Sequence, residues 1–273
     1  MSALRSAMEQ ERRAARFRQL HEGPGILILG NAWSIGSAKR LEGMGYAAIG
    51  TSSAALATEL GLEDNGVGRD GVLAHARALT AATELPVAAD LEDGFGPQPE
   101  DCAETIRLAI EAGLAGGSIE DFTGDAAHPI HDFKAAVARV AAAAAAARAS
   151  GTGFVLTARA ENFAWKRHDL ADTIARLQAF EAAGADVLFA PNLPDLQAVQ
   201  AVCAAVTRPV NILMGPASPD WSLAELQAAG VRRVSLGHAL ARTAEDAWAA
   251  AARAVLDTGR FAYRRAVVEF FAG

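Results

Sequence analysis

The sequence has few cysteines, few aromatic residues and no excess of positive charge. Its two cysteines, Cys102 and Cys203, are too few for a disulfide framework or a thiolate zinc site. Aromatic residues make up 6% of the chain and hydrophobic residues 51%, which favours helices packed around a sheet over an aromatic-rich β-sandwich. The formal net charge of −7 argues against a nucleic-acid-binding surface, because such a surface needs a basic face.

Long apolar segments are also missing. The longest candidate is the alanine run 141–147 between Arg139 and Arg148, which is far shorter than the roughly 20 residues of a membrane span. Residues 2–13 are charged and lack the apolar core of a signal peptide. We therefore expect a cytoplasmic protein that binds neither membranes nor nucleic acids.

A joint between a helix and a strand recurs four times along the chain. Each copy consists of a helix end, a glycine and an apolar segment, at residues 42–50, 111–119, 182–189 and 228–236. Glycine ends helices readily because it adopts the left-handed conformation at little cost. The recurrence indicates a series of similar βα units.

Eight apolar segments separated by amphipathic helical patterns are the expected strands, at 26–31, 47–52, 87–92, 117–120, 154–159, 187–191, 210–214 and 234–237. No Pro/Gly/Ser-rich linker divides the chain, so we predict the α/β class and a single (β/α)₈ barrel domain over residues 1–273. A leading helix is expected within 1–22 and a C-terminal helix within 258–273. The alternative is a doubly wound open sheet, but no Gly-x-Gly-x-x-Gly motif follows the first strand.

Three acidic residues at strand ends are candidate metal ligands. Asp90 and Glu92 close the third expected strand at a spacing of two, which would place both on one face of that strand. Glu120 closes the fourth strand, and the ends of parallel barrel strands meet at one face. Converging carboxylates suit Mg²⁺ or Mn²⁺, which prefer oxygen ligands. The alternative for the first pair is a solvated acidic turn.

Other polar residues near strand ends are candidates for binding the substrate. Arg159 could hold a substrate carboxylate with two hydrogen bonds, or form a structural salt bridge with Glu161 or Glu120. The segment after the second strand could bind a carboxylate through its backbone N–H groups, or its serines could cap the following helix. The expected substrate-binding residues are Thr51, Ser52, Ser53, Ala54, Gly94 and Asn211.

Several titratable residues are candidates for proton transfer. Asp64 could reach back toward the metal from its loop, although it also suits a turn in Glu63-Asp64-Asn65-Gly66. His128, His131 and His238 follow the fourth and eighth strands and are possible proton carriers, with a structural role as the alternative for each. The expected catalytic residues are Arg159, Asp64, His238 and Glu161.

Four motifs in order resemble the isocitrate lyase and phosphoenolpyruvate mutase superfamily. They are Gly50-Thr51-Ser52-Ser53-Ala54 with Leu60-Gly61 and Asp64, Asp90-Leu91-Glu92-Asp93-Gly94-Phe95-Gly96, Ile119-Glu120-Asp121, and Thr157-Ala158-Arg159-Ala160-Glu161. The second stands in place of the superfamily's Asp-x-Asp-x-Gly-[Phe/Tyr]-Gly.

The resemblance implies an α/β barrel that acts on 2-oxo acids or phosphonates. It implies a Mg²⁺ ion held largely through water by Asp90, Glu92 and Glu120. It also implies that the backbone of residues 52–54, together with Arg159, binds the substrate carboxylate. Proteins that the chain resembles often exchange their last helices between the subunits of a tetramer. We therefore expect a homo-oligomer, a tetramer or a dimer, with 258–273 as the exchanged helix.

The sequence also departs from both main branches of the superfamily. The lyases carry Lys-Lys-Cys-Gly-His after the fourth strand, whereas residues 122–128 here read Phe-Thr-Gly-Asp-Ala-Ala-His. The Lys-Thr-Asn-type gating loop of the mutases is missing too, and Glu92 replaces an aspartate. Neither isocitrate lysis nor phosphoryl migration can therefore be carried over from the motifs.

Decarboxylation of an oxaloacetate-like acid makes the smallest demand on the residues present, because it forms an enolate without a base. We therefore expect a Mg²⁺-dependent C–C lyase acting on a small 2-oxo or 2-hydroxy carboxylic acid, with a decarboxylase ranked before a lyase of the isocitrate or methylisocitrate type. The alternatives are P–C bond chemistry of the phosphoenolpyruvate mutase or phosphonopyruvate hydrolase type, and a non-catalytic ligand-binding barrel.

Overall fold

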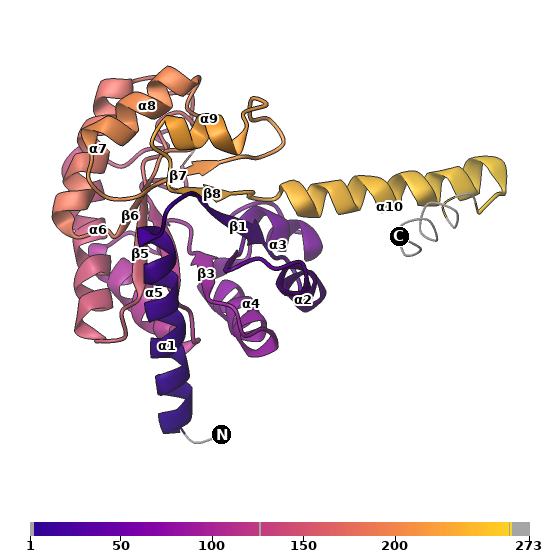
Figure 1. Ribbon diagram of the computed structural model, residues 1–273, viewed down its shortest axis with the longest axis horizontal. Coiled ribbons are helices and arrows are strands. Elements are labelled where there is room, and N and C mark those ends of the chain that lie inside the picture. Colours follow the sequence, from indigo (N-terminus) through magenta and orange to yellow (C-terminus); the bar gives the residue numbers. More distant parts are fainter. Residues whose placement is uncertain (1–2, 126, 262, 264–273) are drawn as a thin grey trace.

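The sheet of the protein consists of eight strands, namely β1 (Leu27–Asn31), β2 (Ile49–Gly50), β3 (Val87–Asp90), β4 (Gly116–Glu120), β5 (Val155–Arg159), β6 (Val187–Phe189), β7 (Val210–Leu213) and β8 (Arg233–Ser235). In this computed structural model, which describes residues 3–125, 127–261 and 263, all neighbouring strands pair in parallel and β8 closes on β1 (Figure 1). The closed sheet confirms the (β/α)₈ barrel and excludes the doubly wound alternative.

Helices connect the strands and surround the barrel. They are α1 (Ala3–Glu22), α2 (Ile35–Gly43), α3 (Ser53–Glu59), α4 (Gly68–Ala82), α5 (Pro99–Glu111), α6 (Phe133–Ala149), α7 (Leu170–Ala183), α8 (Leu196–Ala205), α9 (Leu223–Ala228) and α10 (Ala239–Thr258). The four expected helix-to-strand joints are present. Gly45, Gly113, Gly184 and Gly230 have φ angles of 89°, 87°, 110° and 96°, in the left-handed region where a side chain is unfavourable.

The leading helix α1 covers the end of the barrel at which the strands begin. Phe17 is fully buried there, in a cluster with Leu27, Val155 and Val187 from β1, β5 and β6. A Cβ atom on Gly116 would lie 2.8 Å from the Phe17 ring, so the close approach of α1 requires glycine at that position. The barrel is thereby closed at this end and open only at the other.

The third strand is shorter than expected, and this changes the geometry of its acids. β3 ends at Asp90, whereas the sequence predicted that it would continue to Glu92. Glu92 has a φ angle of 50°, so the backbone has left the extended conformation in which alternate side chains share a face. The prediction that Asp90 and Glu92 share one strand face is therefore wrong.

The last described helix, α10, extends away from the barrel (Figure 1). Ala241 is its one buried residue among those described, while Trp248 and Leu256 are 65% and 80% exposed. The expected C-terminal helix at 258–273 falls mostly outside the described residues, and its exchange between subunits stays a prediction. No described helix has both the length and the apolar character that a membrane crossing requires.

Candidate active site

A cavity of about 290 Å³ lies inside the barrel at the ends of the strands. All eight strands contribute to its lining, together with the loops that follow β2, β4, β5 and β8. Most of the residues singled out from the sequence line it, namely Thr51, Ser52, Ser53, Ala54, Asp64, Asp90, Glu120, Arg159, Glu161, Asn211 and His238. Glu92 and Gly94 are not part of the lining.

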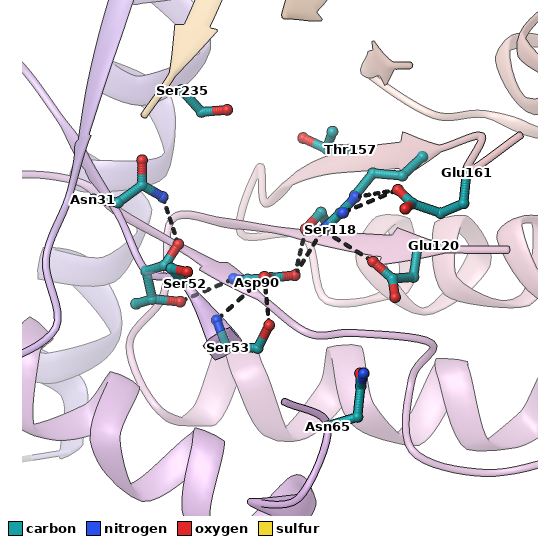
Figure 2. A network of polar contacts seen from close by, with 12 residues as sticks. Asn31, Ser52, Ser53, Asn65, Asp90, Ser118, Glu120, Thr157, Glu161 and Ser235 are labelled. Atoms are coloured by element: carbon teal, nitrogen blue, oxygen red, sulfur yellow. Dashed lines mark hydrogen bonds and ion pairs between the residues drawn. The ribbon is translucent and has the colours of Figure 1, made fainter. Parts of the chain in front are cut away.

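Asp90 is the centre of the polar network in this cavity (Figure 2). Its Oδ2 accepts hydrogen bonds from the hydroxyl of Ser53 at 2.9 Å and from the Ser53 N–H at 3.3 Å. Its Oδ1 lies 3.0 Å from Nη1 of Arg159 and 3.5 Å from the hydroxyl of Ser118. The N–H of Asp90 donates to the hydroxyl oxygen of Thr51 at 2.9 Å. The carboxylate is therefore held in one orientation by Ser53 at the start of α3 and by side chains of β4 and β5.

Arg159 contacts three carboxylates at once. Nη1 lies 3.0 Å from both Asp90 and Glu120, and Nε and Nη2 each lie 2.9 Å from Oε1 of Glu161. Its guanidinium also lies over the Phe189 ring, 4.9 Å from the centroid. Burial alone would lower the pKa of Arg159, but the three carboxylates outweigh it and raise that pKa. The salt bridges that the sequence offered as an alternative are thus present, and Arg159 also lines the cavity.

Two of these partners are buried acids. Burial raises the pKa of Glu120 well above its usual value, and the attraction of Arg159 does not offset this effect. Burial likewise raises the pKa of Glu161. The N–H of Glu161 donates to Asp121 at 2.8 Å, and Asp121 in turn pairs with Arg176 at 3.0 Å. This second ion pair anchors the end of β5 to α7.

Glu92 and Gly94 lie in the turn after β3 rather than in the cavity lining. Glu92 is 5% exposed, its Oε1 has no hydrogen-bond partner in the described part of the chain, and burial and the repulsion of Asp90 raise its pKa to about 8. Gly94 has a φ of 93°, and a Cβ there would lie 2.7 Å from Sγ of Cys102 on α5. The expected role of Gly94 in substrate binding stays a prediction that its position does not support.

Ser52 and Ser53 have different roles after β2. The Ser52 hydroxyl accepts a hydrogen bond from the Ala55 N–H at 3.3 Å and caps α3, as the alternative from the sequence proposed. Ser53 instead binds Asp90. The N–H groups of Ser52 and Ala54 have no acceptor among the described residues, so both can bind a ligand.

The candidate proton carriers are divided between the cavity and the surface. Asp64 lines the cavity from the loop after α3, and accepts a hydrogen bond from the Asn65 N–H at 3.1 Å in the turn that the sequence suggested. His238 also lines the cavity, at the start of α10. His128 is exposed and bonds to Asp125, and neither it nor His131 is part of the lining.

An aromatic pair that the sequence did not single out borders the cavity. The rings of Phe122 and Trp165 stack with centroids 4.3 Å apart and planes 3° apart. They come from the loops after β4 and β5, and both line the cavity. Phe122 thus supplies an aromatic side chain from the segment after β4, in which the sequence lacks the expected lyase motif. The only sequence signal was the position of both residues in loops after strands that end in acids.

The inner part of the cavity contains a second polar cluster, of which only Asn211 was a predicted site residue. Arg233 of β8 donates hydrogen bonds to Oδ1 of Asn211 at 2.8 Å and to the hydroxyl of Thr157 at 3.0 Å. Nδ2 of Asn211 donates to Ser235 at 3.0 Å. All four residues line the cavity. The available signal was incomplete, because Arg233 and Ser235 are spaced by two in β8, whereas the sequence predicted that this strand would begin at residue 234.

The acidic residues near the cavity suit a hard divalent cation. They supply only oxygen donors, and Glu92 has a buried oxygen without a partner among the described residues. Repulsion by Asp90 contributes to the raised pKa values of both Glu92 and Glu120. Among the described residues, however, no three acidic, histidine or cysteine side chains are close enough together to hold an ion directly. A cation at these residues would therefore have to be held largely through water, and its binding stays a prediction.

Comparison with known proteins places these features in a family. The family model described as phosphoenolpyruvate phosphomutase matches residues 17–256. The 2-methylisocitrate lyase of Escherichia coli K12 is 34% identical over 68% of this chain and 65% of that protein. The oxaloacetate decarboxylase of Bradyrhizobium diazoefficiens is 29% identical over 90% of this chain and 83% of that protein.

Solved structures show the same barrel. A protein from Burkholderia cenocepacia J2315 is 49% identical, with a TM-score of 0.92 over 97% of this chain and 98% of that one. A 2,3-dimethylmalate lyase is 25% identical, with a TM-score of 0.83 over 91% and 88% of the two chains.

Proposed function

Because the chain belongs to the phosphoenolpyruvate mutase family, as its motifs indicated, we propose that it is an enzyme that breaks a C–C bond in a small 2-oxo or 2-hydroxy carboxylic acid. Decarboxylation of an oxaloacetate-type acid is the first candidate, and Mg²⁺ is the proposed cofactor. The observation that carries the proposal is the contact of Arg159 with Asp90, Glu120 and Glu161 inside the cavity. The relatives named as a 2-methylisocitrate lyase and an oxaloacetate decarboxylase support it.

The substrate carboxylate would bind at the start of α3. The N–H groups of Ser52 and Ala54, which have no acceptor among the described residues, can donate to it. The Arg159 guanidinium, which also lines the cavity, supplies positive charge. Asp90 cannot rotate away, because Ser53, Ser118 and Arg159 hold it. Ser52, Ala54 and Arg159 would thus orient the substrate before any bond is broken.

In decarboxylation, the bond between the substrate and its departing carboxylate breaks, and the electron pair stays on the substrate as an enolate. A bound divalent cation would supply positive charge where this enolate develops. A proton must then reach the enolate carbon, and Asp64, Glu161 and His238 are its candidate donors because all three line the cavity. Phe122 and Trp165 limit the access of water from their side.

P–C bond chemistry on a phosphonopyruvate-like substrate is the second candidate. It is favoured by one observation, the description of the family model that matches residues 17–256. A non-catalytic barrel is the remaining alternative. It would not require the buried acidic cluster, which is unfavourable to maintain without a charged ligand.

The experiment that tests the proposal measures the release of pyruvate from a panel of 2-oxo acids, 2-hydroxy acids and phosphonopyruvate, with Mg²⁺ and with EDTA. We expect release from an oxaloacetate-type acid that chelation abolishes and that the Glu120→Ala substitution reduces at least 100-fold. Glu104→Ala on the exposed face of α5 is the matched control. Turnover that persists in EDTA or in the Glu120→Ala variant would contradict the role of the metal.

A further inference from the structure

The turn that follows β3 has an unfavourable backbone conformation and carries Glu92. Within residues 91–96, Glu92, Gly94 and Phe95 have φ angles of 50°, 93° and 60°. Glu92 and Phe95 each have a Cβ atom, so the left-handed region is costly for both. Such conformations persist where the surrounding structure holds them, often at functional sites. Contacts from elsewhere in the fold must therefore hold this turn in place.

Arg139 of α6, which does not line the cavity, binds the turn directly. Its Nη2 donates hydrogen bonds to the carbonyl of Asp93 at 2.5 Å and to the carbonyl of Gly96 at 2.9 Å. The same nitrogen lies 3.6 Å from Oδ2 of Asp93. Because the two carbonyl groups are three residues apart, one guanidinium group fastens most of the turn to α6.

Side chains of α5 hold the turn from a second helix. The hydroxyl of Thr105, which is fully buried, donates to the carbonyl of Gly94 at 2.7 Å. Sγ of Cys102 lies 3.4 Å from the carbonyl of Asp93. Inside the turn, the N–H of Phe95 donates to Oδ1 of Asp93 at 2.7 Å. Two helices therefore bind the carbonyl groups of the turn and limit its movement.

The burial of Arg139 is poorly compensated. The residue is 2% exposed, and its Nε and Nη1 atoms have no hydrogen-bond partner in the described part of the chain. The neighbouring buried positions on α6 are apolar, namely Ala136, Val140 and Ala143. A buried charge with unsatisfied donors lowers stability, and an apolar side chain of similar length could fill the same space. Stability alone therefore does not account for an arginine at this position, whereas its two bonds to the turn do.

The turn connects these contacts with the acids of the candidate active site. The carbonyl of Glu92 accepts a hydrogen bond from the N–H of Glu120 at 3.0 Å, which ties the turn to the end of β4. The Glu92 carboxyl is close enough to Asp90 and Asp64 for their repulsion to raise its pKa. Its buried Oε1 has no partner among the described residues. The backbone of the turn, rather than a hydrogen bond to Oε1, therefore sets where this carboxyl lies.

We propose that Arg139 and Thr105 are positioning residues for a divalent cation, because they hold the turn so that the Glu92 carboxyl stays beside Asp90 and Glu120. Without their hydrogen bonds the turn relaxes toward ordinary φ angles, and the carboxyl moves away from the other two acids. The affinity for the cation then falls although no candidate ligand has been removed. This inference rests on the proposed function, in which these acids bind Mg²⁺.

The experiment measures the dissociation constant of Mn²⁺, which electron paramagnetic resonance reports from the signal of the free ion, with the full chain and no substrate. Arg139→Met should raise this constant about tenfold or more, the effect typical of losing a residue that orients a metal ligand. Thr105→Val should raise it in the same direction. Thr105→Ser keeps the hydroxyl group and should keep the wild-type affinity.

Two further measurements separate positioning from a general loss of stability. In the cation-free protein, Arg139→Met should speed hydrogen exchange of the Gly94 N–H, which donates to the Leu91 carbonyl at 3.0 Å within the turn. Arg13→Met is the matched control, because Arg13 is 9% exposed and donates to the Thr80 carbonyl at 2.7 Å, away from this turn. It should change neither the Mn²⁺ affinity nor the exchange of Gly94. If Arg139→Met does not fold, the two Thr105 variants decide the test.

The outcomes distinguish this inference from the proposed function. Wild-type Mn²⁺ affinity in both Arg139→Met and Thr105→Val would overturn the positioning role and leave the proposed cofactor in place. An equal loss of affinity in Arg13→Met would also overturn it, since the effect would then follow from stability. A failure of the wild-type protein to bind Mn²⁺ would contradict the proposed function itself, and this inference with it.

Discussion

Nη1 of Arg159 lies 3.0 Å from Oδ1 of Asp90, which joins the end of β5 to the end of β3 across the intervening β4. Because the same nitrogen also lies 3.0 Å from Glu120, it neutralises part of the charge on two acids. This geometry makes Arg159 both a structural centre of the cavity and a candidate substrate contact. A change at this residue should therefore affect stability and turnover together.

Arg159→Lys should reduce kcat/KM for the active substrate at least 100-fold, because a single ammonium group cannot replace a guanidinium that contacts three carboxylates. It should also lower the free energy of unfolding by about 3 kcal/mol, since an ammonium group cannot pair with all three buried carboxylates and leaves at least one without a partner. Steady-state kinetics and urea unfolding measure the two effects. Arg107→Lys, in an exposed cluster on α5, is the control and should change neither. Turnover within threefold of the wild type would show that Arg159 has only a minor role.

Stability should fall as the pH is lowered below about 6.5 because of His21. Its Nδ1 bonds to the Phe17 carbonyl at 2.8 Å, and Nε2 accepts from Arg233, so the ring is neutral. Burial, with the repulsion of Arg233, lowers the pKa of His21 from 6.5 to about 3. Between these values the unfolded chain binds a proton that the folded protein does not. The stability present above pH 6.5 is therefore lost progressively as the pH falls toward 3.

The His21 contribution should reach ~2 kcal/mol between pH 6.5 and pH 5. His21→Gln should remove this part of the pH dependence, as measured by urea unfolding at both pH values. His168→Gln serves as the control, because His168 is exposed. An identical pH dependence in the wild type and His21→Gln would mean that His21 is protonated in the folded protein.

Gly94→Ala should destabilise the protein more than Gly151→Ala. Both glycines have positive φ angles, 93° and 68°, so each alanine should cost about 1 kcal/mol from the backbone. Only at Gly94 would the new Cβ also meet Sγ of Cys102, at 2.7 Å, whereas nothing lies within 4 Å of a Cβ at Gly151. The clash should add about 1–3 kcal/mol. Equal losses in urea unfolding would show that α5 moves away without cost.

The tryptophan fluorescence of the protein should change when oxalate and Mg²⁺ bind. Trp165 lines the cavity and stacks on Phe122, so a ligand there alters its surroundings. Trp165→Phe should abolish most of the change. Trp248→Phe should preserve it, because Trp248 is 65% exposed on α10, which extends away from the barrel. A full response in the Trp165→Phe variant would place the ligand elsewhere.

Much of the outer part of the site could be predicted from the sequence. Acids and an arginine at the ends of expected strands must meet at one face of a closed barrel, and Asp90, Glu120 and Arg159 do so. The position of Glu92 could not be predicted in this way. The strand stops at Asp90, and Glu92 adopts a left-handed backbone conformation in the turn that follows. The sequence shows an apolar segment followed by acids, and this pattern would be the same if the strand continued to Glu92.

The sequence by itself determined the fold, the family and the positions of the acids along the chain. These properties depend on local signals, such as strand periodicity, glycine at helix ends and motifs of adjacent residues. The tertiary structure alone decided which of these groups share a space. The contacts of Arg233 with Asn211, Thr157 and His21 join β8 to β7, β5 and α1, and residues so distant in the chain are brought together only by closure of the barrel.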